Sequence, residues 1–125
     1  MSESDEIQEL REKAHDVMNR LWGDRSEREL MAAEELAPEF FDLASSCCFG
    51  AFWSRPQLDM RSRSLCTVAQ LAALGRSNEL KIHLRGALHL GITREELLEV
   101  LMQTSQYAGI PAAVQALNAA AEVLD

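Results

Sequence analysis

Apolar residues recur along the chain with helical spacing, and short segments with typical helix-end residues separate these stretches. Asp59 suits the N-cap of one helix, which Gly75 would stop, and Ser77 suits the N-cap of the next, which ends at Gly91. The segment RPQL, residues 55–58, is typical of a turn. The pattern predicts helices over residues 3–21, about 26–54 with a break near Pro38, 59–74, 77–90 and 94–108.

The end of the chain has equally clear helix signals. Thr93 and Glu96 have the spacing of a capping box, and Pro111 suits the first turn of a last helix. Because cap, helix and glycine stop repeat three times, we expect an all-α, antiparallel bundle of about six helices. Residues 1–125 are expected to form a single domain. Its N-terminal helix, within residues 1–25, has few apolar positions and could pack on a neighbouring subunit.

Composition and charge narrow the function classes. Apolar residues make up 47% of the chain and charged residues 26%, as in ordinary globular proteins. The net charge of −8 argues against nucleic acid as a partner, since binding phosphates requires a basic face. No apolar run approaches the roughly 20 residues that cross a membrane, and the acidic start MSESDEIQEL is unlike a secretory signal. We therefore expect a cytoplasmic protein.

The three cysteines do not form a recognisable framework. Cys47 and Cys48 are adjacent, which suits neither a disulfide network nor a zinc site, so no metal is expected. Cys66 lies in an apolar run and is predicted to be a small core residue. No C-x-x-C motif occurs in the chain.

Glu79 and His83 are the most informative polar pair. They are four residues apart, hence adjacent on a helix, and fall on the apolar arc of residues 77–90. An acid and an imidazole on such an arc are costly unless they pair or face a wet cavity. They form either a structural pair at a helix start or a functional site. His15 and His89 are expected on the surface.

A second polar stripe lies on the helix at residues 59–74, which is apolar nearly all round and therefore expected to be central and buried. Arg63, Thr67 and Gln70 share this stripe. Arg63 forms either an ion pair with an acid or a clamp for a substrate carboxylate, for which its planar guanidinium is well suited. Tyr107, at the edge of the helix at 94–108, either points its hydroxyl into a pocket or packs.

Five segments, all within residues 55–124, carry a family resemblance: RSRSL, ALGR, ELKIHLRGAL, GITREELLEVL and YAGIPAA. In this order and spacing they resemble the carboxymuconolactone decarboxylase family, in the branch that lacks C-x-x-C. The resemblance implies an alkylhydroperoxidase D-like fold, assembled as a homohexamer or homotrimer. It also implies a reaction without cofactor, in which 4-carboxymuconolactone loses CO₂ to give 3-oxoadipate enol-lactone in the protocatechuate branch of aromatic catabolism.

Two comparisons with the family pattern bear on the chemistry. In the alkylhydroperoxidase D branch, a C-x-x-C precedes a histidine by four residues; aligned on His83, the cysteine positions hold Arg76 and Glu79. This argues against dithiol peroxidase chemistry. Relatives of the decarboxylase often read ALNNG where this chain reads ALHLG, with His89 and Leu90, which points to an altered substrate.

The resulting hypothesis assigns a role to each candidate residue. His83 donates a proton and Glu79 orients its ring. Arg63 holds a substrate carboxylate, Tyr107 is an additional donor, and Gln70 contributes to substrate binding. The alternatives are a thiol peroxidase and a non-catalytic oligomer that binds a small molecule.

Overall fold

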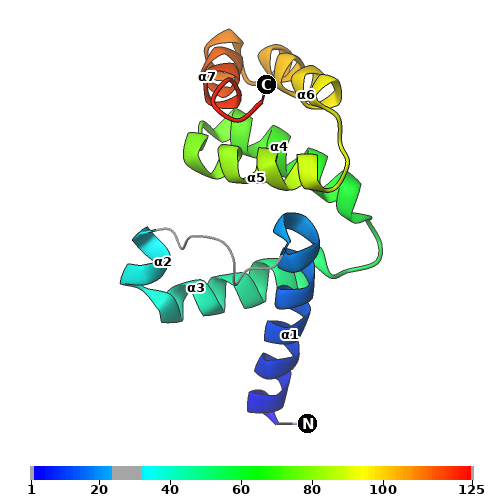
Figure 1. Ribbon diagram of the computed structural model, residues 1–125, viewed down its shortest axis with the longest axis vertical. Helices are drawn as coiled ribbons and strands as arrows, with labels where there is room; N and C mark the ends of the chain where they lie inside the picture. Colours follow the sequence, from blue (N-terminus) through cyan, green and yellow to red (C-terminus); the bar gives the residue numbers. More distant parts are fainter. Residues whose placement is uncertain (1, 24–31, 125) are drawn as a thin grey trace. The chain divides into compact units, whose positions relative to one another are not determined.

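The computed structural model describes residues 2–23 and 32–124, and these residues form helices and turns. The all-α class predicted from the sequence is confirmed (Figure 1). The described residues contain seven α-helices and one π-helix, where the sequence predicted about six helices. Their bounds are α1 Glu3–Trp22, α2 Ala32–Leu36, α3 Pro38–Ser45, η2 Ser46–Trp53, α4 Met60–Leu74, α5 Ser77–His89, α6 Arg94–Tyr107 and α7 Ile110–Ala120.

Local capping explains why several helices begin and end where the sequence predicted. The Asp59 side chain accepts a hydrogen bond of 2.7 Å from the Ser62 backbone and starts α4. Gly75 ends α4 with a φ of 72°, a left-handed conformation that favours glycine. Thr93 forms the predicted capping box at the start of α6. The predicted cap at Ser77 is wrong, because the N-cap position of α5 falls on Arg76 and has no side-chain hydrogen bond.

The second predicted helix, from about Ser26 to Ser54, is more varied than expected. Its first residues lie outside the described part of the chain. The predicted break is confirmed, because α2 ends at Leu36 and α3 begins at Pro38. Beyond Ser45 the helix continues as the π-helix η2, which the sequence did not predict.

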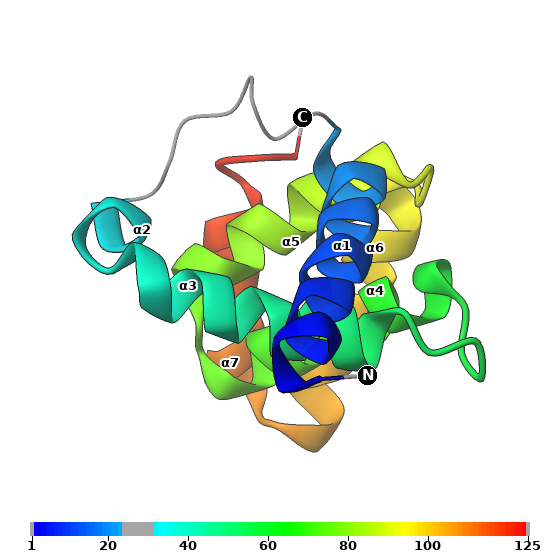
Figure 2. The same ribbon diagram turned by 90° about the horizontal axis from the view of Figure 1, so that it is seen from below.

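The chain divides into two compact units, Met1–Leu58 and Asp59–Asp125. In the first unit, α1 lies across the helix formed by α3 and η2 (Figure 2). Gly50 permits this crossing, because a Cβ atom at its position would overlap the backbone carbonyl of Leu10 on α1. Phe49 reinforces the contact with an edge-on packing against Trp22, with the ring centroids 5.6 Å apart.

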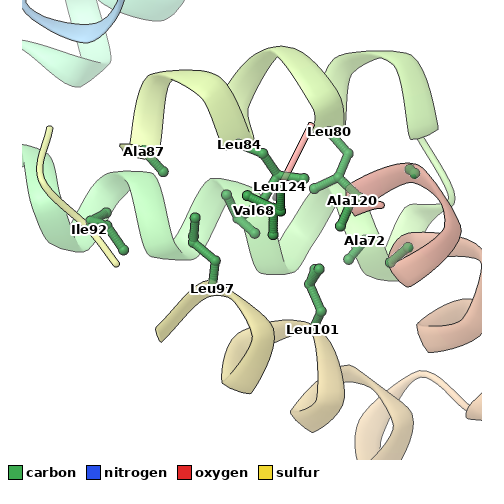
Figure 3. Packing of buried hydrophobic residues seen from close by; sticks show 12 residues of the cluster. Val68, Ala72, Leu80, Leu84, Ala87, Ile92, Leu97, Leu101, Ala120 and Leu124 are labelled. Carbon is green, nitrogen blue, oxygen red and sulfur yellow. The ribbon is translucent and has the colours of Figure 1, made fainter. Parts of the chain in front are cut away.

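In the second unit, the α6–α7 pair packs on the α4–α5 pair (Figure 1). Side chains from all four helices meet in one apolar core, which includes Val68, Leu84 and Leu101 (Figure 3). The buried residues of α7 are all alanines, which lets its backbone lie close to its neighbours; they are Ala113, Ala116, Ala119 and Ala120. This core holds the helix that carries His83.

Helix α4 is less buried than the sequence predicted. Its buried residues are Ser64, Val68 and Ala72, which form one stripe, while Cys66 is exposed. The prediction that Cys66 is a core residue is therefore wrong. The chain has enough apolar residues on α4 for several faces, but the core of this unit lies on one side of the helix only.

None of the helices within residues 2–23 and 32–124 is long and apolar enough to cross a membrane. The cytoplasmic location, the single domain over residues 1–125 and the packing of the N-terminal helix on a neighbouring subunit stay predictions.

Candidate active site

The position of His83 follows from the buried stripe of α5. Leu80, Leu84 and Ala87 are buried and fix this helix against the core. An α-helix turns by about 100° per residue. Viewed down the axis of α5, His83 therefore lies roughly 60° to 70° from the centre of that stripe, and Glu79 lies about 110° from it. His83 therefore lies at the margin of the core, and Glu79 lies beyond it.

Burial dominates the electrostatics of His83. The residue as a whole is half-buried, whereas its Nδ1 atom is shielded from solvent. Burial lowers the pKa of His83 from 6.5 to about 4, and the negative charge of Glu79 opposes this by raising it. At neutral pH the ring is therefore uncharged.

The predicted position of Glu79 on the buried side of α5 is wrong. The sequence placed its side chain on the core-facing arc, but Glu79 is exposed. The reason is geometric, because it lies in the first turn of α5, on the solvent side of His83, where a long charged side chain reaches water. Its charge nonetheless acts on His83, so the predicted pairing of the two groups is retained electrostatically. His15 and His89 are exposed, as predicted.

The predicted stripe on α4 is split between two environments. Arg63 is half-buried, and its carbonyl accepts a hydrogen bond of 2.8 Å from the Thr67 hydroxyl. Gln70 is exposed, so the stripe runs from the margin of the core to solvent. Arg63 is half-buried rather than buried, and its role as a carboxylate clamp stays a prediction.

Tyr107, the last residue of α6, is 87% exposed. Within the described chain it is therefore not packed, which contradicts the packing alternative, and the alternative that its hydroxyl lies in a pocket stays a prediction. A binding role for Tyr107 would require a substrate or a second chain to cover the end of α6.

The cysteines do not favour thiol chemistry. Cys47, Cys48 and Cys66 are free and exposed. The pKa of the Cys48 thiol is raised by partial burial and by its neighbour Cys47, which lowers the fraction of reactive thiolate. Within the described ranges, no group of three or more His, Cys, Asp or Glu side chains could hold a metal ion.

Sequence reasoning missed Ser64. This side chain is fully buried, and its hydroxyl has no hydrogen-bond partner among the described residues. A signal was present, since Ser64, Val68 and Ala72 follow helical spacing on what proves to be the core-facing side of α4.

The chain matches a known protein family. The model of the carboxymuconolactone decarboxylase family matches residues 38–122. The chain belongs to this family.

Three relatives show how far the similarity reaches. The chain is 42% identical over 96 residues to a 4-carboxymuconolactone decarboxylase of Acinetobacter baylyi. The matched segment covers 77% of this chain and 72% of the relative. It is 33% identical over 76 residues to a nitrosuccinic acid decarboxylase, npaB, of Metarhizium robertsii, covering 61% of this chain and 53% of the relative. It is 32% identical over 97 residues to an uncharacterized 15.0 kDa protein of Paracoccus denitrificans, covering 76% and 72%. The two named enzymes support a decarboxylase function, and thus a carboxy-lyase.

Proposed function

We propose that the chain removes CO₂ from 4-carboxymuconolactone or a related carboxylated lactone, giving 3-oxoadipate enol-lactone in the first case. The observation that carries this proposal is the 42% identity to the Acinetobacter decarboxylase over 77% of the chain. The half-buried histidine beside an acidic residue supports it, because both residues lie within residues 38–122, which the family model matches.

The reaction asks two things of the protein. The bond between the ring carbon and the carboxylate carbon breaks, and its electron pair moves through the ring alkene onto the lactone carbonyl oxygen. CO₂ leaves in this step. A proton then forms a new C–H bond as the electrons return from that oxygen. The protein must stabilise the oxyanion and deliver the proton.

In this proposal His83 delivers the proton. Because burial keeps the free ring neutral at pH 7, the proton must be taken up as the anionic substrate binds. The substrate's negative charge raises the pKa of the ring, in the same direction as Glu79 already does. Arg63 holds a carboxylate of the substrate, with Gln70 and Tyr107 as further binding residues.

The exposed positions of Gln70 and Tyr107 suggest that a second copy covers them. We propose the homohexamer or homotrimer expected from the sequence. Large apolar side chains exposed on the second unit support self-association: Leu74, Leu88, Met102, Tyr107, Ile110 and Val114. Native mass spectrometry tests this, and a protein that remains monomeric at micromolar concentration would refute it.

The enzymatic proposal is tested by turnover of 4-carboxymuconolactone, followed by ultraviolet absorbance, with and without a chelator. Nitrosuccinate is assayed alongside because of the Metarhizium relative. His83→Ala should lower turnover by about 10²–10⁴-fold. Arg85→Ala is the matched control, because Arg85 is exposed on the opposite side of α5.

The outcomes separate the activity from the assignment of residues. If the wild-type protein turns over neither 4-carboxymuconolactone nor a related carboxylated lactone, the proposed activity is wrong. If His83→Ala folds normally and retains full turnover, the activity stands but the role of His83 is refuted.

A further inference from the structure

A pocket in the first unit lies outside the candidate active site. It has a volume of about 350 Å³ and is formed by α1, α2, α3 and the start of η2. Its apolar lining includes Met18 of α1 and Phe41 of α3. Volumes of this order, with an apolar lining and a few polar groups, are typical of small-molecule sites.

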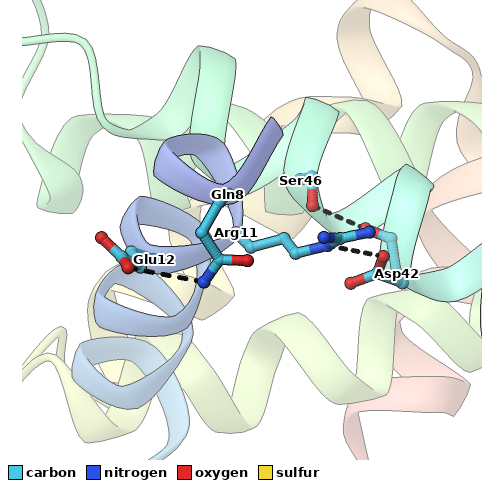
Figure 4. Close-up of polar contacts among 5 residues, drawn as sticks. All are labelled: Gln8, Arg11, Glu12, Asp42 and Ser46. Carbon is cyan, nitrogen blue, oxygen red and sulfur yellow. Dashed lines mark hydrogen bonds and ion pairs between the residues drawn. The ribbon is translucent and has the colours of Figure 1, made fainter. Parts of the chain in front are cut away.

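One side of the pocket carries an arginine that uses only part of its hydrogen-bonding capacity. The Arg11 Nε atom donates to Asp42 at 2.9 Å and ties α1 to α3 (Figure 4). A guanidinium group has a second edge with further donors. Within the described residues, Nη1 and Nη2 of Arg11 have no acceptor, so this edge can bind a second carboxylate.

Two other donors line the same pocket. His15 follows Arg11 by one helical turn, and Ser45 lies on α3; neither side chain has a hydrogen-bond partner within the described ranges. The neighbouring Ser46 hydroxyl is already used, because it donates to the Asp42 carbonyl at 2.7 Å. The unused groups of this pocket are thus predominantly donors.

The two acids that line the pocket, Glu34 and Asp42, both have interactions of their own, and that of Asp42 is with Arg11 inside the pocket. Glu34 is 8% exposed. An incoming anion therefore meets the free edge of Arg11 together with His15 and Ser45, and an apolar body meets Phe41 and Met18.

We propose that this pocket is a second small-molecule site, which binds a small aromatic monocarboxylate. The carboxylate accepts hydrogen bonds from the free edge of Arg11, with His15 and Ser45 beside it. The ring packs against Phe41 and Met18. This site lies within Met1–Leu58 and is independent of the proposed decarboxylase chemistry, which uses residues of Asp59–Asp125.

Benzoate is the probe, titrated into the full-length protein and followed by calorimetry and by backbone amide shifts. The shifts should map to α1 and α3. Acetate, which lacks the ring, should bind at least tenfold more weakly. Arg11→Lys retains a charge for Asp42 but loses the planar second edge, so it should weaken benzoate binding about tenfold. Arg20→Lys, an exposed substitution on the same helix outside the pocket, should bind as the wild type does.

Binding at this pocket is distinguished from binding at the candidate active site by His83→Ala, which should leave the affinity for benzoate unchanged. The proposal is overturned by absence of binding at millimolar benzoate, by shifts confined to the second unit, or by equal affinity in a folded Arg11→Lys protein. If that variant does not fold, the shift map of the unmodified protein and the effect of Ser45→Ala decide the question.

Discussion

Lowering the pH should destabilise the folded chain through His83. The pKa of this residue is about 4 in the folded chain and about 6.5 when the ring is in water. The unfolded state therefore takes up the proton first as the pH falls. The stability that a neutral His83 contributes is complete above pH 6.5 or so and is lost progressively towards pH 4.

The magnitude follows from the two pKa values. A difference of about 2.5 pH units at 1.36 kcal/mol per unit limits the loss to about 3 kcal/mol. Because the unfolded state binds the proton more tightly, the free energy of unfolding falls by roughly 2.5 kcal/mol between about pH 7.5 and about pH 4.5. Carboxylates also titrate near the lower end of this range, so the wild-type profile alone does not isolate the histidine.

The assay is therefore a comparison with His83→Gln, which is neutral at every pH used. Urea unfolding of both proteins gives the free energy of unfolding at each pH. The two profiles should diverge below about pH 6.5, with the wild-type protein losing about 2.5 kcal/mol more by pH 4.5. Parallel profiles, together with a His83 ring that titrates near pH 6.5 by NMR, would refute the burial argument.

Substitutions at three further positions test the packing and capping, each by urea unfolding. Gly50→Ala should lower the free energy of unfolding by about 2 kcal/mol, because the new Cβ overlaps the Leu10 carbonyl; an unchanged value would contradict the close crossing of α1 and η2. Ser64→Ala should raise it by about 1 kcal/mol, since a buried hydroxyl without a partner is removed, and a loss would reveal a missing partner. Thr93→Ala should cost about 1 kcal/mol through loss of the α6 cap, whereas Thr93→Ser, which retains the hydroxyl, should cost much less.

The helix ends could be predicted from the sequence because capping is local. Asp59 and Thr93 bond to backbone groups three residues away, and Gly75 adopts its left-handed conformation within one turn. The π-helix η2 could not be predicted in this way. Its segment lies against α1, and the close approach at Gly50 depends on a helix some 40 residues away in the sequence.

The candidate site was predictable only in part. The adjacency of Glu79 and His83 follows from their spacing, and the charge of Glu79 raises the pKa of His83 against the larger effect of burial. Their different depths depend on which side of α5 meets the core, and a short helix with many apolar residues does not determine this. Cys66 was misplaced for the same reason, because its apolar neighbours on α4 did not reveal on which side the core lies.

The alanine face of α7 limits which side chains can replace its four buried alanines. With a methyl group as the only side chain at Ala113, Ala116, Ala119 and Ala120, the space between α7 and its neighbours leaves little room for anything longer. Size, more than polarity, then governs variation at these four positions. In a saturation library, glycine and serine should survive there, while valine and leucine, although more hydrophobic, should be eliminated.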